Sequence, residues 1–223
     1  MAQRRIFLLS PASTGGKRAA LLFNERAEFA VAQKVRSGPG APIGEVFSFL
    51  SGLYFRGKLA YANAFQNPPA RVGGIHVITP TDGLCSPDLM IRLADLERFA
   101  TVPIEADEPR YRIPLDRDSR ALATAIGSKC AVVLLGSVAT GKYVDALLPV
   151  FGPRLVFPRE FVGRGDMARG GMLLQRAASG EEFSYLPVSD PGRLGLGQRK
   201  RARVKMRAPK REPELAAHPP ARR

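Results

Sequence analysis

Cys130-Ala-Val-Val-Leu-Leu135 is an uninterrupted apolar run that leads directly into Gly136-Ser-Val-Ala-Thr-Gly141-Lys142-Tyr143. A short apolar run bounded by a glycine predicts a buried β-strand. The next residues, Tyr143–Phe151, have the apolar spacing of a helix. A buried strand joined to a helix by a short polar loop is the unit from which parallel sheets are built. This stretch therefore indicates an α/β protein.

The same alternation continues on both sides of this stretch. Further strands are predicted at Arg5–Leu9, Gly74–Thr79 and Arg154–Phe157, with an edge strand at Glu182–Val188. Helices are predicted at Lys17–Arg36, Gly44–Phe65, Ile91–Phe99, Arg117–Ile126, Tyr143–Phe151 and Asp166–Ala178. Strands separated by helices imply one three-layer domain, in which helices cover both faces of a mostly parallel sheet. We assign residues 1–188 to this domain.

The charge of the chain is strongly positive. Its 223 residues include 34 Lys or Arg and 20 Asp or Glu, which give a formal charge of +14. Eleven basic and three acidic residues fall within 189–223, so this segment carries +8 and the preceding 188 residues carry +6. The segment has almost no large apolar side chains, so we predict a disordered basic tail. A charge of this size favours nucleic acid as the partner, ahead of a membrane surface or a phosphorylated ligand.

Cysteine and histidine usage argues against a metal site. Cys85 and Cys130 form no C-x-x-C pair, and His76 and His218 are the only histidines. We expect two buried thiols in a reducing compartment and no metal or other cofactor. The apolar run at Ile6–Leu9 is too short for a signal peptide, and no segment has the apolar length of a membrane helix. These features predict a cytoplasmic protein without a membrane partner.

Four loops follow the predicted parallel strands, where ligands bind in open α/β sheets. They are Ser10–Lys17, Pro80–Asp88, Gly136–Lys142 and Pro158–Arg169. In the first, hydroxyls including that of Ser10 stand beside glycines and the cations Lys17 and Arg18, a composition that suits an anion. The alternative is a capped helix start with two solvated cations.

The third loop matches the phosphate-binding pattern G-x-x-x-x-G-K. Gly136, Ser137 and Lys142 are its candidate phosphate contacts. Tyr143 occupies the position of the Ser or Thr that would bind Mg²⁺, and no later apolar strand supplies a metal-binding Asp. We therefore favour a simple phosphate contact over ATPase or GTPase activity.

The fourth and second loops carry candidate carboxylates. Arg164 and Arg169 could grip a phosphate, with Asp166 between them as an orienting group or a general base. The alternative role of Asp166 is that of an N-cap. Asp82 is a second candidate acid or base, although Asp82-Gly83 is first of all a turn signal.

One predicted helix mixes aromatic and basic residues. Within Phe47–Tyr61, the residues Ser51, Tyr54 and Lys58 fall on one face, while Arg56 is a candidate phosphate contact. That face either borders the crevice or is a solvated edge.

Taken in order, several short motifs resemble the YaaA family of peroxide-stress proteins. They are Leu8-Leu9-Ser10-Pro11-Ala12, Gly83-Leu84-Cys85-Ser86-Pro87-Asp88-Leu89-Met90 and Arg164-Gly165-Asp166-Met167-Ala168-Arg169. A related group of uncharacterised bacterial domains is similar at Ser51-Gly52-Leu53-Tyr54-Phe55-Arg56-Gly57-Lys58-Leu59-Ala60-Tyr61 and at Val132–Gly136. The chain departs from the family at Ser13, where the family has a lysine. The resemblance implies DNA binding and a role in limiting oxidative damage, and it implies polyanion binding more firmly than catalysis.

The leading hypothesis is a single α/β domain that binds nucleic acid through a basic crevice, assisted by its tail. The phosphate contacts would be Lys17, Arg18, Arg56, Lys142, Arg164 and Arg169. One alternative is an enzyme acting on a nucleobase or nucleotide, such as an N-glycosidase or base exchanger, with Asp82 or Asp166 as the catalytic group. Another is a nucleotide-binding protein that uses the loop Gly136–Lys142.

Overall fold

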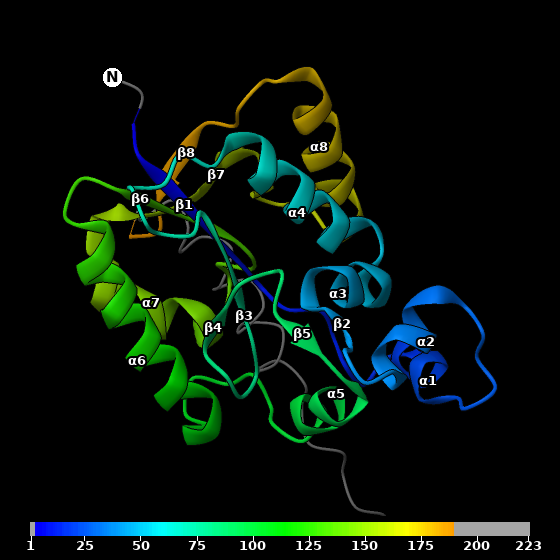
Figure 1. Ribbon diagram of the computed structural model, residues 1–223. Helices are drawn as coiled ribbons and strands as arrows, with labels where there is room; N and C mark the ends of the chain where they lie inside the picture. Colours follow the sequence, from blue (N-terminus) through cyan, green and yellow to red (C-terminus); the bar gives the residue numbers. More distant parts are fainter. Residues whose placement is uncertain (1–2, 190–223) are drawn as a thin grey trace, which may run out of the picture.

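Four parallel strands form the centre of the main sheet in the computed structural model, which describes residues 3–189 (Figure 1). The six strands lie in the order β4-β3-β1-β6-β7-β8. Their bounds are β1 Arg5–Leu9, β3 Ile75–Ile78, β4 Leu84–Cys85, β6 Ala131–Leu135, β7 Leu155–Pro158 and β8 Tyr185–Pro187. Strands β4 and β8 are antiparallel to their neighbours. The predicted α/β class and mostly parallel sheet are confirmed, whereas the tail predicted for 189–223 lies outside the described residues except for Ser189.

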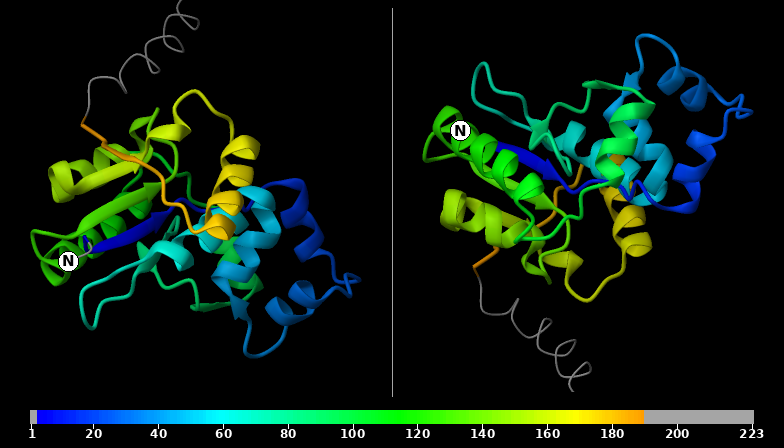
Figure 2. Two further views of the ribbon diagram at one scale, coloured as in Figure 1. Left: turned by 90° about the horizontal axis from the view of Figure 1, so that it is seen from above. Right: turned by 90° about the horizontal axis from the view of Figure 1, so that it is seen from below.

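Helices cover both faces of this sheet, as the two views of Figure 2 show. One layer contains α1 Lys17–Phe23, α2 Ala30–Arg36, α3 Ile43–Ser51, α4 Leu53–Phe65, α5 Leu93–Ala100 and α8 Asp166–Ser179. The other contains α6 Pro109–Ile126 and α7 Gly141–Phe151. Alternate side chains of β1 enter the two cores: Phe7 and Leu9 join the first, and Ile6 and Leu8 the second. This division confirms the predicted three layers.

Two helices predicted as continuous are each split in two. Residues 24–29 leave the helical path between α1 and α2, because the Asn24 side chain accepts a hydrogen bond from the Arg26 N–H and forms a local turn. The Arg36 guanidinium donates to the carbonyl groups of Asn24 and Ala27 in this loop. Gly52 separates α3 from α4 with a φ of 61°, a conformation that favours glycine.

Other elements differ from the sequence prediction in their bounds. Helix α6 begins at Pro109 rather than at Arg117, because a proline in the first helical turn costs no hydrogen bond and Glu108 accepts one from the Arg110 N–H. Segments predicted as loops form the two-residue strand β4 and the small antiparallel pair β2 (Ala41–Pro42) and β5 (Met90–Ile91). Short 3₁₀ turns flank β7, η1 at Gly152–Arg154 and η2 at Arg159–Phe161.

The closest helix pair in the first layer is α4 against α8. A Cβ atom at Gly57 would lie 2.7 Å from the backbone oxygen of Gly170, and one at Gly170 would lie 2.9 Å from the Cα of Tyr54. These two glycines therefore let the helix backbones touch. The contact brings Tyr54 of α4 beside Arg169 at the start of α8.

Candidate functional site

The order of the strands marks one place in the sheet as the natural position for a ligand. The connection after β1 leads to β3 on one side, whereas the connection after β6 leads through α7 to β7 on the other side. Ligands of open α/β sheets bind outside the carboxyl ends of two such strands, where the connections diverge. A cleft of about 590 Å³ lies there, lined by Ser10 to Gly15 after β1 and by Ser137, Lys142 and Tyr143 after β6.

Ser10 and Lys58 form the floor of this cleft. Ser10 directly follows β1 and lines the cleft, while Lys58 of α4 lies behind it with only 1% of its surface exposed. The Lys58 Nζ donates to the Ser10 Oγ over 2.8 Å and to the Ser10 carbonyl oxygen over 2.5 Å. The interpretation of this helix face as a solvated edge is therefore wrong for Lys58.

The environment of Lys58 favours its neutral form. No carboxylate of the described residues forms an ion pair with it, and its Nζ lies instead 4.5 Å from the ring centre of Tyr54 and 4.9 Å from that of Phe55. Burial lowers the pKa of Lys58 from 10.5 to about 7, although the Asp166 carboxylate raises it slightly. In a substantial fraction of the molecules, Lys58 is therefore an uncharged amine near neutral pH.

Two tyrosines stand beside this pair. The Tyr54 hydroxyl is buried and makes no hydrogen bond within the described residues. Burial raises the pKa of Tyr54 to about 12, and the nearby Arg169 guanidinium opposes that rise. Burial also raises the pKa of Tyr143, while the Ser10 hydroxyl next to it lowers that pKa. Both phenols are therefore neutral donors at the cleft at physiological pH.

Free backbone donors surround the same space. Helix α7 begins at the cleft with Thr140 as its N-cap, and neither a side-chain cap nor an acidic residue occupies its first turn. In the part of the chain that the structure describes, the N–H groups of residues 12–16 donate no hydrogen bond. Lys142 is half-buried, with its Nζ 5.3 Å from the ring centre of Tyr143. Such a set of donors and one cation suits an anionic group.

The structure brings together some of the predicted site residues. Ser10, Ser137, Lys142 and Asp166 line the cleft, and a Cβ atom at Gly136 would lie 3.0 Å from the Ser10 Cβ. Asp166 is the first residue of α8 and Gly165 is the N-cap, so the N-cap role considered for Asp166 is wrong. Its carboxylate is mainly exposed and lies 3.7 Å from Arg169.

The other predicted cations lie outside the lining of the cleft. Lys17, Arg56 and Arg164 are exposed to solvent. Arg18 donates to the Phe49 carbonyl oxygen over 2.9 Å, and Arg169 donates to that of Phe161 over 3.1 Å. Of the six predicted cations, only Lys142 lines the described cleft. The remaining five border it at a distance or hold loops in place.

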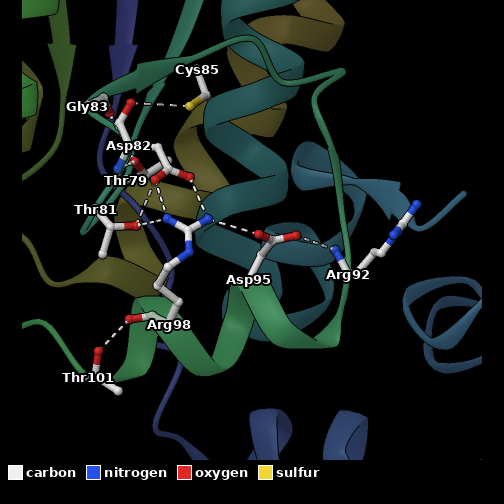
Figure 3. Close-up of polar contacts among 9 residues, drawn as sticks. All are labelled: Thr79, Thr81, Asp82, Gly83, Cys85, Arg92, Asp95, Arg98 and Thr101. Atoms are coloured by element: carbon white, nitrogen blue, oxygen red, sulfur yellow. Dashed lines mark hydrogen bonds and ion pairs between the residues drawn. The ribbon is translucent and has the colours of Figure 1, made fainter. Parts of the chain in front are cut away.

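Asp82 belongs to a separate cluster, in which the turn after β3 meets Asp95 and Arg98 of α5 (Figure 3). The Arg98 guanidinium pairs with both oxygens of Asp82 and with Asp95, over 2.8 Å in the latter case. Thr81 donates a further hydrogen bond to Asp82 over 2.9 Å. Hydrogen bonding to Asp82 is the main cause of the raised pKa of Arg98. Asp82 does not line the cleft, and its oxygens are occupied by this network.

The residues on the cleft floor are only partly predictable from sequence. The spacing of Tyr54 and Lys58 places them on one helix face, a candidate border of the crevice. The contact between Lys58 and Ser10 joins residues 48 positions apart, and no local pattern reports it. Tyr143 was noted only because it breaks the phosphate-loop pattern.

Between residues 3 and 189, no helix has the length and hydrophobicity needed to cross a membrane. The same residues contain no group of three or more His, Cys, Asp or Glu side chains placed to hold a metal ion. No protein-family model, curated protein or solved structure matches the chain, so the resemblance to the YaaA family stays a prediction.

Proposed function

We propose that the protein binds a nucleic-acid strand and seats one of its nucleotides in the cleft between β1 and β6. The observation that carries this proposal is the cleft itself, with its volume of about 590 Å³ at the divergence of two strand connections. This volume falls within the range of small-ligand sites and suits one nucleotide. A duplex is too wide for it, so the bound strand would be single or locally opened.

The walls of the cleft match the two ends of a nucleotide. Lys142 and the free N–H groups of residues 12–15 would hold a phosphate. Leu50, Phe99 and Val102 supply an apolar wall against which a base or sugar could lie. The unpaired Tyr54 hydroxyl would donate a hydrogen bond to the ligand, which would remove the cost of its burial.

The charge around the cleft favours a strand over a free nucleotide. Lys17 and Arg164 are exposed and follow or precede the lining residues Gly15 and Asp166 by two positions. The domain carries +6 without the tail, so further phosphates along a strand would meet a positive surface. Nucleic acid, the partner that the sequence predicts, is therefore the ligand that we propose.

A second candidate function is an enzyme that acts on the seated nucleobase or nucleotide. It is favoured by the Asp166 carboxylate, which lines the cleft and is not fully occupied by Arg169 at 3.7 Å. A carboxylate in that place could activate water or stabilise a developing positive charge. If the Asp166→Asn chain binds the strand normally but turns over no nucleotide, this function is supported. Full turnover by the variant would show that Asp166 is not the catalytic group.

The proposal is tested by fluorescence anisotropy of a labelled single-stranded oligonucleotide, made both as DNA and as RNA. Replacing Lys142 by Ala should weaken binding at least about tenfold, because a charge-assisted phosphate contact is lost. Lys129→Ala is the control: Lys129 also carries one positive charge, but it is exposed to solvent and precedes β6, at the opposite end of the strands from the cleft.

The outcomes of this measurement separate the candidates. Competition by excess nucleoside monophosphate and a log–log salt slope that flattens by about 0.7–0.9 in Lys142→Ala are the expected results. Equal affinities of the Lys142→Ala, Lys129→Ala and parent chains would show that the cleft takes no part. Tight binding of the mononucleotide without binding of the strand would replace the strand by a free nucleotide as the ligand.

A further inference from the structure

Ser10 and Lys58 have the relation of a nucleophile to its base. Ser10 lines the cleft with 6% of its surface exposed, and the Lys58 Nζ contacts its Oγ over 2.8 Å from the buried side. A hydrogen bond of this length between a hydroxyl and a base is the arrangement needed to activate a serine. A substrate in the cleft would therefore reach the hydroxyl while the amine behind it stays sealed from water.

Lys58 forms no ion pair among the described residues, and the Asp166 carboxylate acts on it only from a distance. A buried lysine in a purely structural role is normally paired with a carboxylate, because an isolated buried charge is costly. Within the described residues Lys58 has no ion pair. Its Nζ donates hydrogen bonds to the two oxygens of Ser10 and lies over the rings of Tyr54 and Phe55. This arrangement keeps the amine next to one hydroxyl and favours loss of its proton.

We propose that Ser10 is a catalytic nucleophile and Lys58 its general base, and that together they cleave a carboxylic ester or thioester bound in the cleft. Serine–lysine pairs of this kind perform acyl transfer on several unrelated folds. The inference goes beyond strand binding and does not depend on it, since the reacting pair needs only a carbonyl group at Ser10.

The proton route follows from the contacts at Ser10. The Ser10 hydroxyl donates to the Leu135 carbonyl oxygen over 3.2 Å while Lys58 donates to its Oγ. When Lys58 is uncharged, its lone pair can accept the Ser10 proton instead. The lowered pKa of Lys58, about 7, makes this form available near neutral pH.

The chemical steps balance without a cofactor. As the Ser10 Oγ forms a bond to the carbonyl carbon, Lys58 takes the hydroxyl proton and the carbonyl π electrons move onto the oxygen. Collapse of this intermediate breaks the bond to the alcohol or thiol, which leaves with the proton from Lys58 and gives an acyl-Ser10 ester. Water then attacks the acyl carbon and gives a proton to Lys58. The carboxylic acid departs as Ser10 regains that proton.

The cleft also contains donors for the charged intermediate. Ser137 lines it directly after Gly136, whose backbone lies against the Ser10 side chain. The Ser137 N–H donates no hydrogen bond within the described residues, and the neutral Tyr143 hydroxyl lies beside Ser10. Two such donors would stabilise the oxyanion. Lys142 adds a preference for an ester with a negatively charged group.

Covalent labelling tests this assignment on the full chain. A small alkyl fluorophosphonate forms an Oγ–P bond and releases fluoride when it meets an activated serine. We expect one adduct, located at Ser10 by peptide mass mapping, and a labelling rate that rises as the pH passes through about 7. Lys58→Met should lower the rate at least about 100-fold, which is the lower range for loss of a general base.

Two controls keep the result interpretable. Ser128→Ala removes an exposed hydroxyl before β6, at the opposite end of the strands from the cleft, and should leave labelling unchanged, whereas Ser10→Ala should abolish it. Thermal unfolding of each variant shows whether it is folded. Absence of an adduct on the parent chain, an adduct at another residue, or equal labelling of folded Lys58→Met would overturn the proposal. The probe carries no nucleotide, so failure of strand binding would not affect this readout.

Discussion

Two polar clusters of the molecule differ in whether their basic residue is paired with carboxylates. Around Arg98, the guanidinium is matched by the carboxylates of Asp82 and Asp95, and all three side chains are partly open to solvent. In the floor of the cleft, Lys58 is fully buried, and among residues 3–189 it has no carboxylate partner and the Tyr54 hydroxyl has no hydrogen bond. The first cluster is electrostatically complete and the second is not.

This difference shows where the fold contains polar groups that lower its stability. A compensated surface network adds little to stability and needs no further partner. Uncompensated polar groups in a core lower the stability, and in natural proteins they concentrate where a ligand or a reaction completes them. The contrast supports a functional role for the cleft and a structural role for the Asp82 cluster, and three changes can sharpen or break it.

The largest effect is expected from Lys58→Met as a function of pH. Below about pH 7, Lys58 is charged in both the folded and the unfolded chain, so the full cost of its burial is present. Between about 7 and its ordinary pKa of 10.5, only the unfolded chain holds the proton, and the parent gains stability as the pH rises. The free energy of unfolding of the parent rises by at most about 1.4 kcal/mol per pH unit. Lys58→Met has no group at this position to titrate and lacks this rise.

Urea denaturation of both chains between pH 6 and 9 measures this gain as a difference. Taking the difference removes the contributions of other groups, such as Cys85, whose thiol has a pKa raised by burial to about 11. The stability of the parent relative to Lys58→Met should increase with pH. Parallel curves would mean that Lys58 is charged in the folded protein, and the contrast between the two clusters would be lost.

An intermediate effect is expected where α4 crosses α8. Gly57→Ala would place a Cβ atom 2.7 Å from the Gly170 oxygen and force the helices apart, at a cost of about 1–3 kcal/mol. Gly171→Ala is the matched control on α8, because its Cβ would meet nothing within 4 Å and should stabilise the helix by about 0.5–1 kcal/mol. Thermal unfolding compares the two, and only Gly57→Ala should also weaken oligonucleotide binding. Equal stabilities would show that the close crossing is not required.

The smallest effect is expected from Arg98→Met. The ion pairs that it removes are partly exposed, so we expect a loss of about 1 kcal/mol or less. Strand binding and labelling of Ser10 should stay at parental levels. A clear loss of either activity in a folded Arg98→Met chain would assign Asp82 to the functional site and contradict the separation of the two clusters.

The layers of the fold could be predicted from sequence because each central strand is a short apolar run. The run at Arg5–Leu9 coincides with β1, and the one at Cys130–Leu135 differs from β6 by a single residue. The breaks within helices were missed, since the local turns at Asn24 and Gly52 are supported by contacts with distant side chains. Arg36 reaches back to the loop at Asn24, and Arg18 lies against Gly52.

The location of the candidate site was predicted better from sequence than the residues that form it. The rule that ligands bind at the carboxyl ends of parallel strands led to Ser10, Ser137, Lys142 and Asp166, which line the cleft. Charge alone was a poor guide, because arginine side chains also serve to hold backbone carbonyl groups, as Arg169 does at Phe161. Lys58 was identified only by its helix face, because burial of a lysine is decided by tertiary contacts.

The two edges of the sheet have a consequence for the behaviour of the protein in concentrated solution. The outer strand β4 has two residues, and β8 has three and ends in Pro187, which lacks a backbone N–H group. Short edges that include a proline are poor templates for a strand from another molecule. Added to a net charge of +14, they should keep copies of the chain from joining edge to edge and should disfavour amyloid-like assembly.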